Sequence, residues 1–298
     1  MNKWLFAFLV LVALYLAGSL ISLFLFRNDG VVLGDKIVVV PLDGEITVSG
    51  NQDFFQVGGV SSTELIKTIQ ELDEDSSVKG VIFEINSPGG GVVASQEIAS
   101  AVKSMNKTKY SVIREFGASG AYWIASATDK IIVSPLSITG SIGVYGSYLE
   151  FSELFDKYGV GYQRLVSGKY KDLGVPYRNL TDEERKLFQG KLDIIHEYFI
   201  MDVAKNRHMN FDNVKDVATG EFFLGVEAKK IGLVDELGDK DTAVELMKKQ
   251  LNLTDVGIVE SRKKVTLLDR FFGDVAYQLG RGFGKSIVEF NTRLRINA

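Results

Sequence analysis

Hydrophobic and polar residues alternate along most of the chain, but its first 26 positions follow a different pattern. Residues 4–26 carry no charge and are almost entirely apolar. At ~1.5 Å per residue, a helix of this length spans roughly 34 Å, enough to cross the hydrocarbon core of a membrane. The pattern predicts a transmembrane helix over 4–26, preceded by a short N-terminal tip, 1–3.

A cleaved signal peptide is the alternative for this segment, because Ala17, Gly18 and Ser19 resemble a cleavage site. The apolar region of a signal peptide is normally about 7–15 residues long, and here apolar sequence continues past that site. We therefore expect an uncleaved anchor. Lys3 and the amino terminus precede it, a weak charge bias that places the rest of the chain on the extracytoplasmic side of the cell membrane.

After a linker, 27–35, strand patterns alternate with helix patterns. Short apolar runs predict strands at 36–42, 78–86, 110–116, 130–135 and 161–168. Apolar positions at helical spacing predict helices at 61–77, 92–105, 119–128, 148–159, 181–207, 225–232 and 239–251. Two of these helices open with a capping-box pattern, Ser61 with Glu64 and Thr181 with Glu184. The alternation predicts one α/β domain over 36–260 with mainly parallel strands.

The C-terminal tail, 261–298, has apolar residues at spacings of three and four, with arginines and lysines among them. An amphipathic stretch of this kind can lie on a membrane surface, or it can pack on the domain or on a neighbouring subunit. We favour packing.

Composition narrows the chemistry. The net charge of −4 gives no sign of nucleic-acid binding. The absence of cysteine excludes a thiol nucleophile, disulfides and thiolate metal sites, and no metal or cofactor is predicted. Both histidines, His196 and His208, fall in or just after a long helical pattern, where an ordinary surface or half-buried role is expected. A catalytic site on this chain is therefore expected to work without imidazole.

The segment "FGASGAYW" places a single serine, Ser119, where a strand turns into a helix. Small residues surround it and leave room for a substrate, and the next amide is free at the helix start. The position after Gly120 is Ala121, so this is not the G-x-S-x-G elbow of α/β-hydrolases. Considered alone, Ser119 fits a plain helix N-cap at least as well as a nucleophile.

The loop "NSPGGGV", 86–92, has three consecutive glycines between a predicted strand and a predicted helix. Glycines allow backbone angles denied to other residues and let another backbone approach closely. Their exposed amides can point at a developing negative charge. The phosphate-binding patterns G-x-x-x-x-G-K-[ST] and G-x-G-x-x-G are absent. A structural tight turn and an oxyanion hole both remain open.

The loop "SGKYKDLG", 167–174, offers two lysines, Lys169 and Lys171. A lysine in a loop is usually a solvated charge, with an ordinary pKa of ~10.4. Burial can lower the pKa of a lysine by as much as ~3–5 units. A neutral amine can then accept the proton of a serine in place of histidine, and such a base predicts activity that rises with pH.

Together these loops resemble the signal peptide peptidase A family. The motifs "NSPGGGVVASQEI", "GASGAYWIASA", "ITGSIGV", "SGKYKD" and "GLVDELG" follow the family's order and spacing over roughly residues 36–250. The family consists of membrane-anchored Ser–Lys proteases with the ClpP/crotonase fold. The resemblance therefore implies a ClpP/crotonase-like spiral of ββα units, preceded by the N-terminal transmembrane helix. Ala121 and Trp123 depart from the residues that the family commonly has after its Ser-Gly pair, and Ala121 is expected to narrow the pocket slightly.

The resemblance also implies roles for individual residues. Ser119 would be the nucleophile and Lys171, which is followed by Asp as in the family's lysine motif, the general base. Ser141 of "TGSIGV" would hold the lysine amine by a hydrogen bond. Backbone amides of three glycines would form the oxyanion hole: Gly89, Gly90 and Gly120.

The same resemblance implies a homo-oligomer whose dyads are completed between subunits. The implied substrates are remnant signal peptides and other hydrophobic or unfolded segments at the membrane. Two alternatives remain open at this point. One is a crotonase-like acyl-thioester enzyme, which also uses paired amides but does not need the serine and lysine. The other is a non-catalytic membrane scaffold that assembles into rings.

Overall fold

The computed structural model describes residues 34–50 and 59–261, together with the isolated positions Lys3, Val12, Tyr15 and Gly18. The chain divides into two units at Glu260 and Ser261, and every element below belongs to the first. The predicted transmembrane helix, most of the linker and the C-terminal tail lie outside the described residues. Within the described ranges, no helix is long and apolar enough to cross a membrane.

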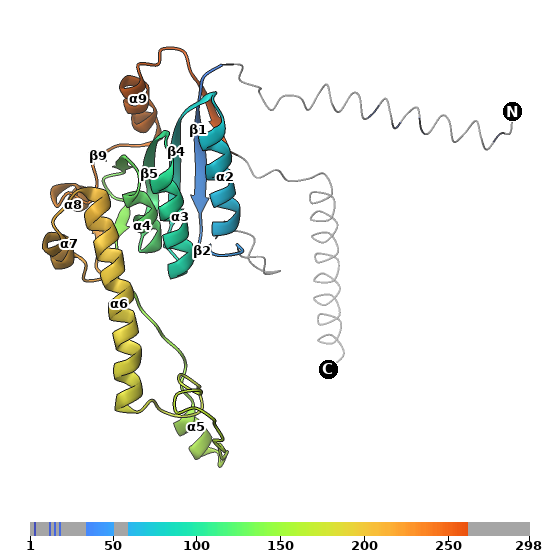
Figure 1. Ribbon diagram of the computed structural model, residues 1–298, viewed down its shortest axis with the longest axis vertical. Coiled ribbons are helices and arrows are strands. Elements are labelled where there is room, and N and C mark those ends of the chain that lie inside the picture. Colours follow the sequence, from blue (N-terminus) through green and yellow to red (C-terminus); the bar gives the residue numbers. More distant parts are fainter. Residues whose placement is uncertain are drawn as a thin grey trace, which may run out of the picture. The chain divides into compact units, whose positions relative to one another are not determined.

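A mainly parallel sheet forms the centre of the described domain (Figure 1). Its strands follow the order β10-β1-β4-β5-β6-β9, and all neighbours along this path pair in parallel. The bounds are β1 (Lys36–Asp43), β4 (Val78–Ser87), β5 (Thr108–Ala118), β6 (Lys130–Val133), β9 (Glu236–Leu237) and β10 (Gly257–Glu260). The predicted α/β class is therefore confirmed.

Helices cover both faces of this sheet, which explains why its central strands read as almost continuous apolar runs. One face packs its apolar side chains against α2 (Ser62–Glu74), α3 (Val92–Ser104) and α4 (Gly120–Ser126). The other face packs against α9 (Lys240–Leu251) through Ala243, Val244 and Met247. The core thus fixes the ends of the strands from which the functional loops leave.

Short strands extend the sheet beside the end of β5. β7 (Ile138–Gly140) pairs in parallel with the last residues of β5, and β8 (Phe222–Leu224) pairs antiparallel with β7. A separate pair, β2 (Ile46–Thr47) and β3 (Val60–Ser61), lies beside the glycine loop through a bridge between Ile46 and Gly90. The sequence pattern did not predict these strands, which are only two or three residues long.

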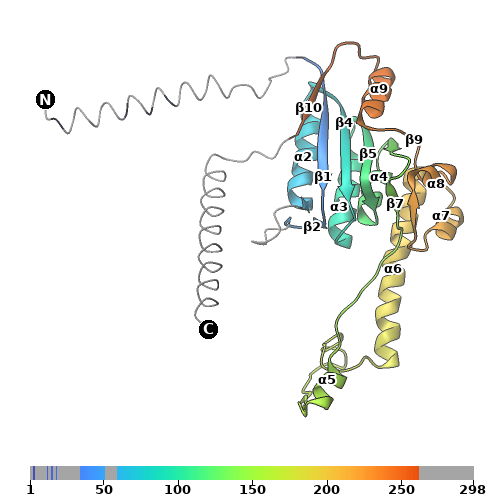
Figure 2. The same ribbon diagram turned by 180° about the vertical axis from the view of Figure 1, so that it is seen from behind.

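Helix α6 (Asp182–Arg207) connects the domain to a projecting segment, residues 144–181, which we call the arm. The C-terminal part of α6 packs into the core through Phe199, Ile200, Val203 and Ala204. Figures 1 and 2 show α5 (Ser152–Lys157), within the arm, at the end of α6 that is far from the sheet. Two shorter helices follow α6 along the chain: α7 (Phe211–Val217) and α8 (Gly225–Lys230).

Both predicted helix starts are confirmed, and the structure shows the complete capping box at Thr181. The Thr181 hydroxyl accepts from the Glu184 amide, and the Glu184 carboxylate accepts from the Thr181 amide in return. At α2, the Ser61 hydroxyl accepts from the Glu64 amide at 3.3 Å. These contacts satisfy amides that a helix start would otherwise leave without partners.

The predicted strand at 161–168 is wrong. These residues lie in the arm, are exposed and adopt no regular secondary structure. An apolar run becomes a strand only where a sheet edge is available for pairing, and the arm offers none. The predicted helix at 148–159 is also shorter than expected, because only Ser152–Lys157 is helical.

Candidate active site

Ser119 occupies a strained turn between β5 and α4. Its backbone angles are φ 53° and ψ −125°, a conformation that costs a residue with a side chain on the order of 1–3 kcal/mol. The turn is held from both sides, because the Ser119 amide donates to the Gly140 carbonyl at 2.9 Å and its carbonyl accepts from the Trp123 amide at 3.0 Å. The following helix, Gly120–Ser126, is buried throughout.

The side chain of Ser119 makes no hydrogen bond with any described residue, although the residue stands at the N-cap position of α4. A plain N-cap serine would accept a hydrogen bond from an amide of the first helical turn. The strained backbone instead leaves the hydroxyl of this half-buried residue without a structural partner among the described residues. This arrangement favours the nucleophile interpretation over the capping one.

The glycine loop after β4 lies directly against this turn. Gly89 has φ +102°, and a Cβ atom there would come within 2.8 Å of the Gly120 amide nitrogen and 2.9 Å of the Ser119 Cβ. The Gly90 amide nitrogen in turn lies 3.5 Å from the place of a Cβ on Gly120. Only glycines allow the loop and the turn to approach this closely.

Two amides of this region have no hydrogen-bond partner among the described residues. The Gly89 amide donates to the Ser87 hydroxyl at 3.2 Å, and the Gly91 amide donates to a backbone carbonyl of β2 at 2.8 Å. The Gly90 and Gly120 amides are left free. Of the three glycines predicted for an oxyanion hole, Gly90 and Gly120 therefore offer donors, while Gly89 supplies the close approach.

Ser141 lies next to the same turn, because it follows the Gly140 whose carbonyl holds the Ser119 amide. It too has a positive φ, 50°. Its hydroxyl donates to the Gly220 carbonyl at 3.2 Å. The structure thus brings Ser141 to the neighbourhood of Ser119, and among the described residues its hydroxyl bonds to a backbone carbonyl and not to a lysine.

The two candidate lysines have different surroundings. Both carboxylate oxygens of Glu183 accept from the Lys169 Nζ, at 2.7 and 2.6 Å, and this contact is the main cause that raises the pKa of Lys169. A raised pKa keeps an amine protonated and unsuited to act as a base. The Lys171 side chain is exposed and has no hydrogen bond or ion pair with a described residue. The surroundings therefore favour Lys171, a choice for which the sequence offered only the family resemblance.

Lys171 and Ser119 do not meet within one chain. Lys171 belongs to the arm, and the residue after it is tied to the first turn of α6 through Arg178 and Glu184. Glu184 precedes the core residue Phe199 by 15 positions of α6, which corresponds to about 22 Å at the usual helical rise. About 22 Å of helix thus lies between the contacts that hold the Lys171 turn and the part of α6 that packs on the core, more than a lysine side chain can bridge.

Neither histidine contacts Ser119. The His196 Nε2 lies 3.2 Å from the Ile142 carbonyl oxygen, and His208 ends α6 in a left-handed conformation. Within the part of the chain that the structure describes, no group of three or more His, Cys, Asp or Glu side chains could hold a metal ion.

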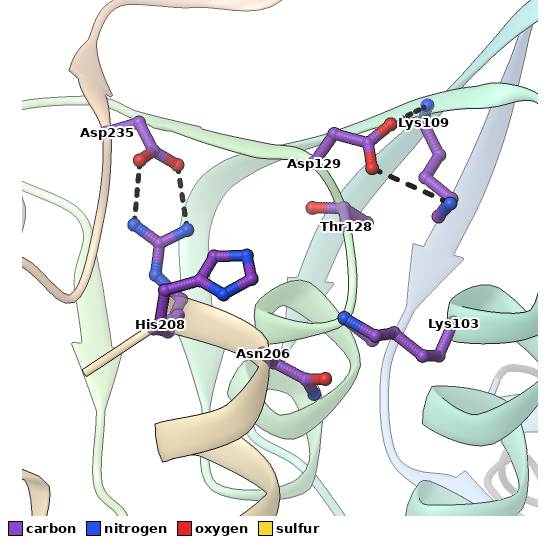
Figure 3. A pocket seen from close by; sticks show the side chains of 9 residues that line it. Lys103, Lys109, Thr128, Asp129, Asn206, His208 and Asp235 are labelled. Carbon is purple, nitrogen blue, oxygen red and sulfur yellow. Dashed lines mark hydrogen bonds and ion pairs between the residues drawn. The ribbon is translucent and has the colours of Figure 1, made fainter. Parts of the chain in front are cut away.

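A cavity of about 270 Å³ lies at the opposite end of α4 (Figure 3). Its charged lining is largely paired: Arg207 bonds to Asp235 at 2.8 Å, and Lys109 lies 3.6 Å from Asp129. The seven residues of α4 separate it from Ser119, about 10 Å along the helix. It is not part of the candidate active site.

The sequence-based prediction missed two residues that shape the site. Ser87 holds the amide of Gly89, and both backbone groups of Ile46 bond to the glycine loop, at 2.9 and 2.8 Å. The serine in "NSPGGG" was a visible signal. Ile46 gave no signal, because its contribution comes from backbone atoms of a two-residue strand.

The fold and the site define a class: a mixed α/β protein with a serine on a strand-to-helix turn and free amides beside it, an arrangement that suits a serine hydrolase. The Peptidase family S49 model matches residues 101–254, and the Clp protease model matches residues 55–137, which agrees with a ClpP-like fold.

Several known proteins are similar to this chain. A candidate protease of Methanocaldococcus jannaschii is 35% identical over 95% of this chain and 91% of its own length. A candidate signal peptide peptidase SppA of Enterococcus faecium is 35% identical over 78% of this chain and 68% of its own length. Protease 4 of Haemophilus influenzae is 31% identical over 73% of this chain and 35% of its own length.

The chain belongs to peptidase family S49 and is a serine protease related to the signal peptide peptidases of the SppA type. Membership of a peptidase family leaves the thioester enzyme and the non-catalytic scaffold without support.

Proposed function

We propose that the protein is a membrane-anchored endopeptidase in which Ser119 of one copy is activated by Lys171 of a neighbouring copy. Its substrates are remnant signal peptides and other hydrophobic or unfolded segments, and its catalytic domain lies on the extracytoplasmic side. The observation that carries the proposal is the strained Ser119 turn, whose free hydroxyl lies beside the free Gly90 and Gly120 amides.

In the proposed reaction, the neutral Lys171 amine accepts the proton of the Ser119 hydroxyl as its oxygen attacks a peptide carbonyl. The Gly90 and Gly120 amides stabilise the negative charge on that carbonyl oxygen. The resulting ammonium group protonates the leaving amine as the peptide bond breaks. Water, deprotonated by the same amine, then attacks the acyl-enzyme ester and releases the second product. Ser141 lies where its hydroxyl can hold the incoming amine.

A second copy is needed because the arm carries Lys171 away from Ser119 of its own chain. The arm also exposes large apolar side chains, among them Tyr145 (88% exposed), Leu149 (73%), Tyr158 (72%) and Leu165 (95%). Exposed apolar side chains gathered on one segment are typical of a surface that a partner covers. Both features support an assembly in which the arm of one copy lies on the domain of the next.

Apolar side chains around the site and the predicted anchor support the proposed substrate class. Apolar side chains are exposed on the elements that border the site, such as Val93 at the start of α3 and Phe116 near the end of β5. These side chains suit apolar substrate residues. The predicted anchor over 4–26 would place the site near the membrane, where remnant signal peptides remain after cleavage.

Mixing two inactive variants of the full chain tests the proposal. Ser119→Ala and Lys171→Ala should each abolish cleavage of a hydrophobic signal-peptide substrate, whereas the control Lys169→Ala should retain it. When the two inactive variants assemble together at equal amounts, about a quarter of the sites should combine an intact serine with an intact lysine from two chains. Activity of the mixture should therefore recover to about a quarter of the wild-type value.

Three outcomes would contradict this proposal. Full activity of Lys171→Ala would contradict the assignment of Lys171 as the general base. A large loss of activity in His196→Asn, with normal activity of Lys171→Ala, would indicate that an imidazole is the base instead. Failure of the co-assembled mixture to recover activity, with a sizing measurement that shows mixed oligomers, would exclude a dyad shared between copies.

A further inference from the structure

The turn that carries Lys171 has little local structure of its own. Residues 158–181 contain neither a helix nor a strand, and the turn is closed by a few local backbone hydrogen bonds, such as the one from the Lys171 amide to the Gly168 carbonyl at 3.1 Å. A general base must nevertheless be held within a few tenths of an ångström of its working position. Something other than secondary structure has to fix this turn.

Asp172, the residue after Lys171, is the buried point of the turn, with a side chain only 8% exposed. Arg164 donates to both carboxylate oxygens of Asp172, from Nε at 2.6 Å and from Nη2 at 2.8 Å. The Arg178 Nε donates to the same carboxylate at 3.0 Å. One carboxylate is thus clamped by two guanidinium groups.

Arg178 extends this contact to the helix behind the turn. Its Nη1 and Nη2 atoms donate to both carboxylate oxygens of Glu184, at 2.8 and 2.7 Å. The Glu184 carboxylate also accepts from the Thr181 amide at 2.9 Å and so caps the start of α6. The far end of α6 is anchored where the Phe199 ring stacks on Trp123, with centroids 4.4 Å apart.

We name these four side chains the arginine–carboxylate cluster: Arg164, Asp172, Arg178 and Glu184. Its two positive and two negative charges balance, so the cluster adds no net charge near the lysine. Arg164 first and then Arg178 hold the pKa of Asp172 well below its usual range, and Arg178 is the main cause that lowers the pKa of Glu184 to about 2. The cluster therefore stays ionised at neutral pH.

A second contact between the turn and α6 lacks these properties. The Lys169–Glu183 pair has side chains that are 65% and 59% exposed. Exposed ion pairs contribute little because water screens the charges and both side chains lose freedom. This pair provides a matched contact that joins the same two segments.

We propose that Asp172, through Arg178 and Glu184, positions Lys171 for its task in the neighbouring active site. The inference rests on the proposed function of Lys171 and extends it. Asp172 and its partners touch neither substrate nor the reacting atoms. They act by fixing the backbone from which the base projects, so that the amine reaches the Ser119 hydroxyl of the next copy in a productive position.

Steady-state kinetics of Asp172→Asn, Arg178→Gln and Arg178→Lys in the assembled full chain test this inference, with Glu183→Gln as the control. Misplacing a catalytic group by about 1 Å can cost about 100-fold in rate. We expect Asp172→Asn and Arg178→Gln to lower kcat about 10- to 100-fold with KM nearly unchanged, because the base and not the substrate is displaced. We also expect both variants to displace the midpoint of the pH–rate profile.

The conservative variant and the control should behave differently. Arg178→Lys should recover part of the lost rate, since lysine keeps the charge without the two-pronged geometry. Glu183→Gln should keep kcat within about twofold of the wild-type value, and the midpoint of its pH–rate profile should stay where it is in the wild type. The rate at which a phosphonate probe labels Ser119 should follow kcat across the series.

Normal kcat in both Asp172→Asn and Arg178→Gln, with an inactive Lys171→Ala, would overturn the inference and leave the proposed function intact. An active Lys171→Ala would instead overturn the proposed function. A loss of rate that follows dissociation of the oligomer, seen by sizing, would assign the cluster to assembly and would also overturn the positioning role. Circular dichroism of each variant separates these outcomes from unfolding.

Discussion

Replacing Gly90 by alanine tests the oxyanion hole with the change of a single methyl group. A Cβ atom at this position would lie 2.1 Å from the Ile46 carbonyl oxygen and 2.6 Å from the Ile46 amide nitrogen. Both neighbours are backbone atoms, so no flexible side chain can move aside. The glycine loop itself must shift, and the free Gly90 amide shifts with it.

The size of this shift follows from the contact. An ordinary Cβ contact begins at 3.4 Å, so the loop and β2 must separate by about 1.3 Å, a large change in an interior packed as tightly as a crystal. A displaced amide no longer points at the developing oxyanion. Loss of one such donor costs roughly 2.7–4 kcal/mol of barrier, or about 100- to 1000-fold in kcat.

The assay compares Gly90→Ala with Gly91→Ala. A Cβ on Gly91 meets nothing closer than 3.7 Å, and its φ of −58° suits alanine. Both variants add the same methyl group to the same loop, so a general effect of stiffening the loop cancels. We expect kcat to fall by the stated factor in Gly90→Ala and to stay within severalfold of wild type in Gly91→Ala, with KM similar in all three proteins.

A folded Gly90→Ala protein with kcat within about threefold of wild type would refute the assignment of the Gly90 amide to the oxyanion hole. Loss of one oxyanion-hole donor lowers kcat by at least about 100-fold. Equal losses in the two variants would refute it as well, since they would show that the loop as a whole is sensitive. Thermal unfolding of each variant shows whether a loss of rate reflects a loss of fold.

Two further predictions concern the arm and its anchor. Because Arg178 lowers the pKa of Glu184 to about 2 from an ordinary value of ~4.3, the ionised Glu184 stabilises the arm above about pH 4 and loses this contribution as the pH falls toward 2. Hydrogen exchange should show protection around the first turn of α6 that is constant from neutral pH to about pH 5, declines below about pH 4 and is lost near pH 2. Unchanged protection at pH 2 would contradict this prediction. Phe199→Ala should lower the free energy of unfolding by ~3–5 kcal/mol, because Phe199 is 1% exposed and stacked on Trp123. Urea denaturation measures this loss. A loss below ~1 kcal/mol would show that this contact does not anchor α6.

The central sheet could be predicted from the sequence because its signals are local. Runs such as "KIVVVPL" and "VKGVIFEIN" are apolar on both faces, and β1 and β4 form where they stand. The helix starts at Ser61 and Thr181 could be predicted for the same reason, since a capping box involves residues three positions apart.

The short strands and the arm could not be predicted in this way. β7 and β8 each contain three residues and form only because the end of β5 offers a partner, and a local pattern holds no information about that partner. The run at 161–168 has a strand-like pattern but lies in the arm, where no sheet edge is available. In both cases tertiary context decides the outcome.

At the candidate site, the sequence predicted which loops matter but not what each residue offers. Three glycines in a row could not be told apart until the structure showed that Ser87 occupies the Gly89 amide and leaves the Gly90 amide free. Lys169 and Lys171 likewise have the same chemistry in the sequence. They differ only because Glu183, in the following helix, pairs with one of them.

The site is divided between two kinds of structure, and this division has a consequence for control of the enzyme. Ser119 and the free amides lie at a sheet end where the buried α4 and the β7 carbonyl keep the serine in a strained conformation. Lys171 lies on an arm that the arginine–carboxylate cluster ties to the first turn of α6, and the other end of α6 packs into this core. In the proposed mechanism, a single chain therefore holds a preformed nucleophile without its base, and proteolysis begins only where copies of the chain meet.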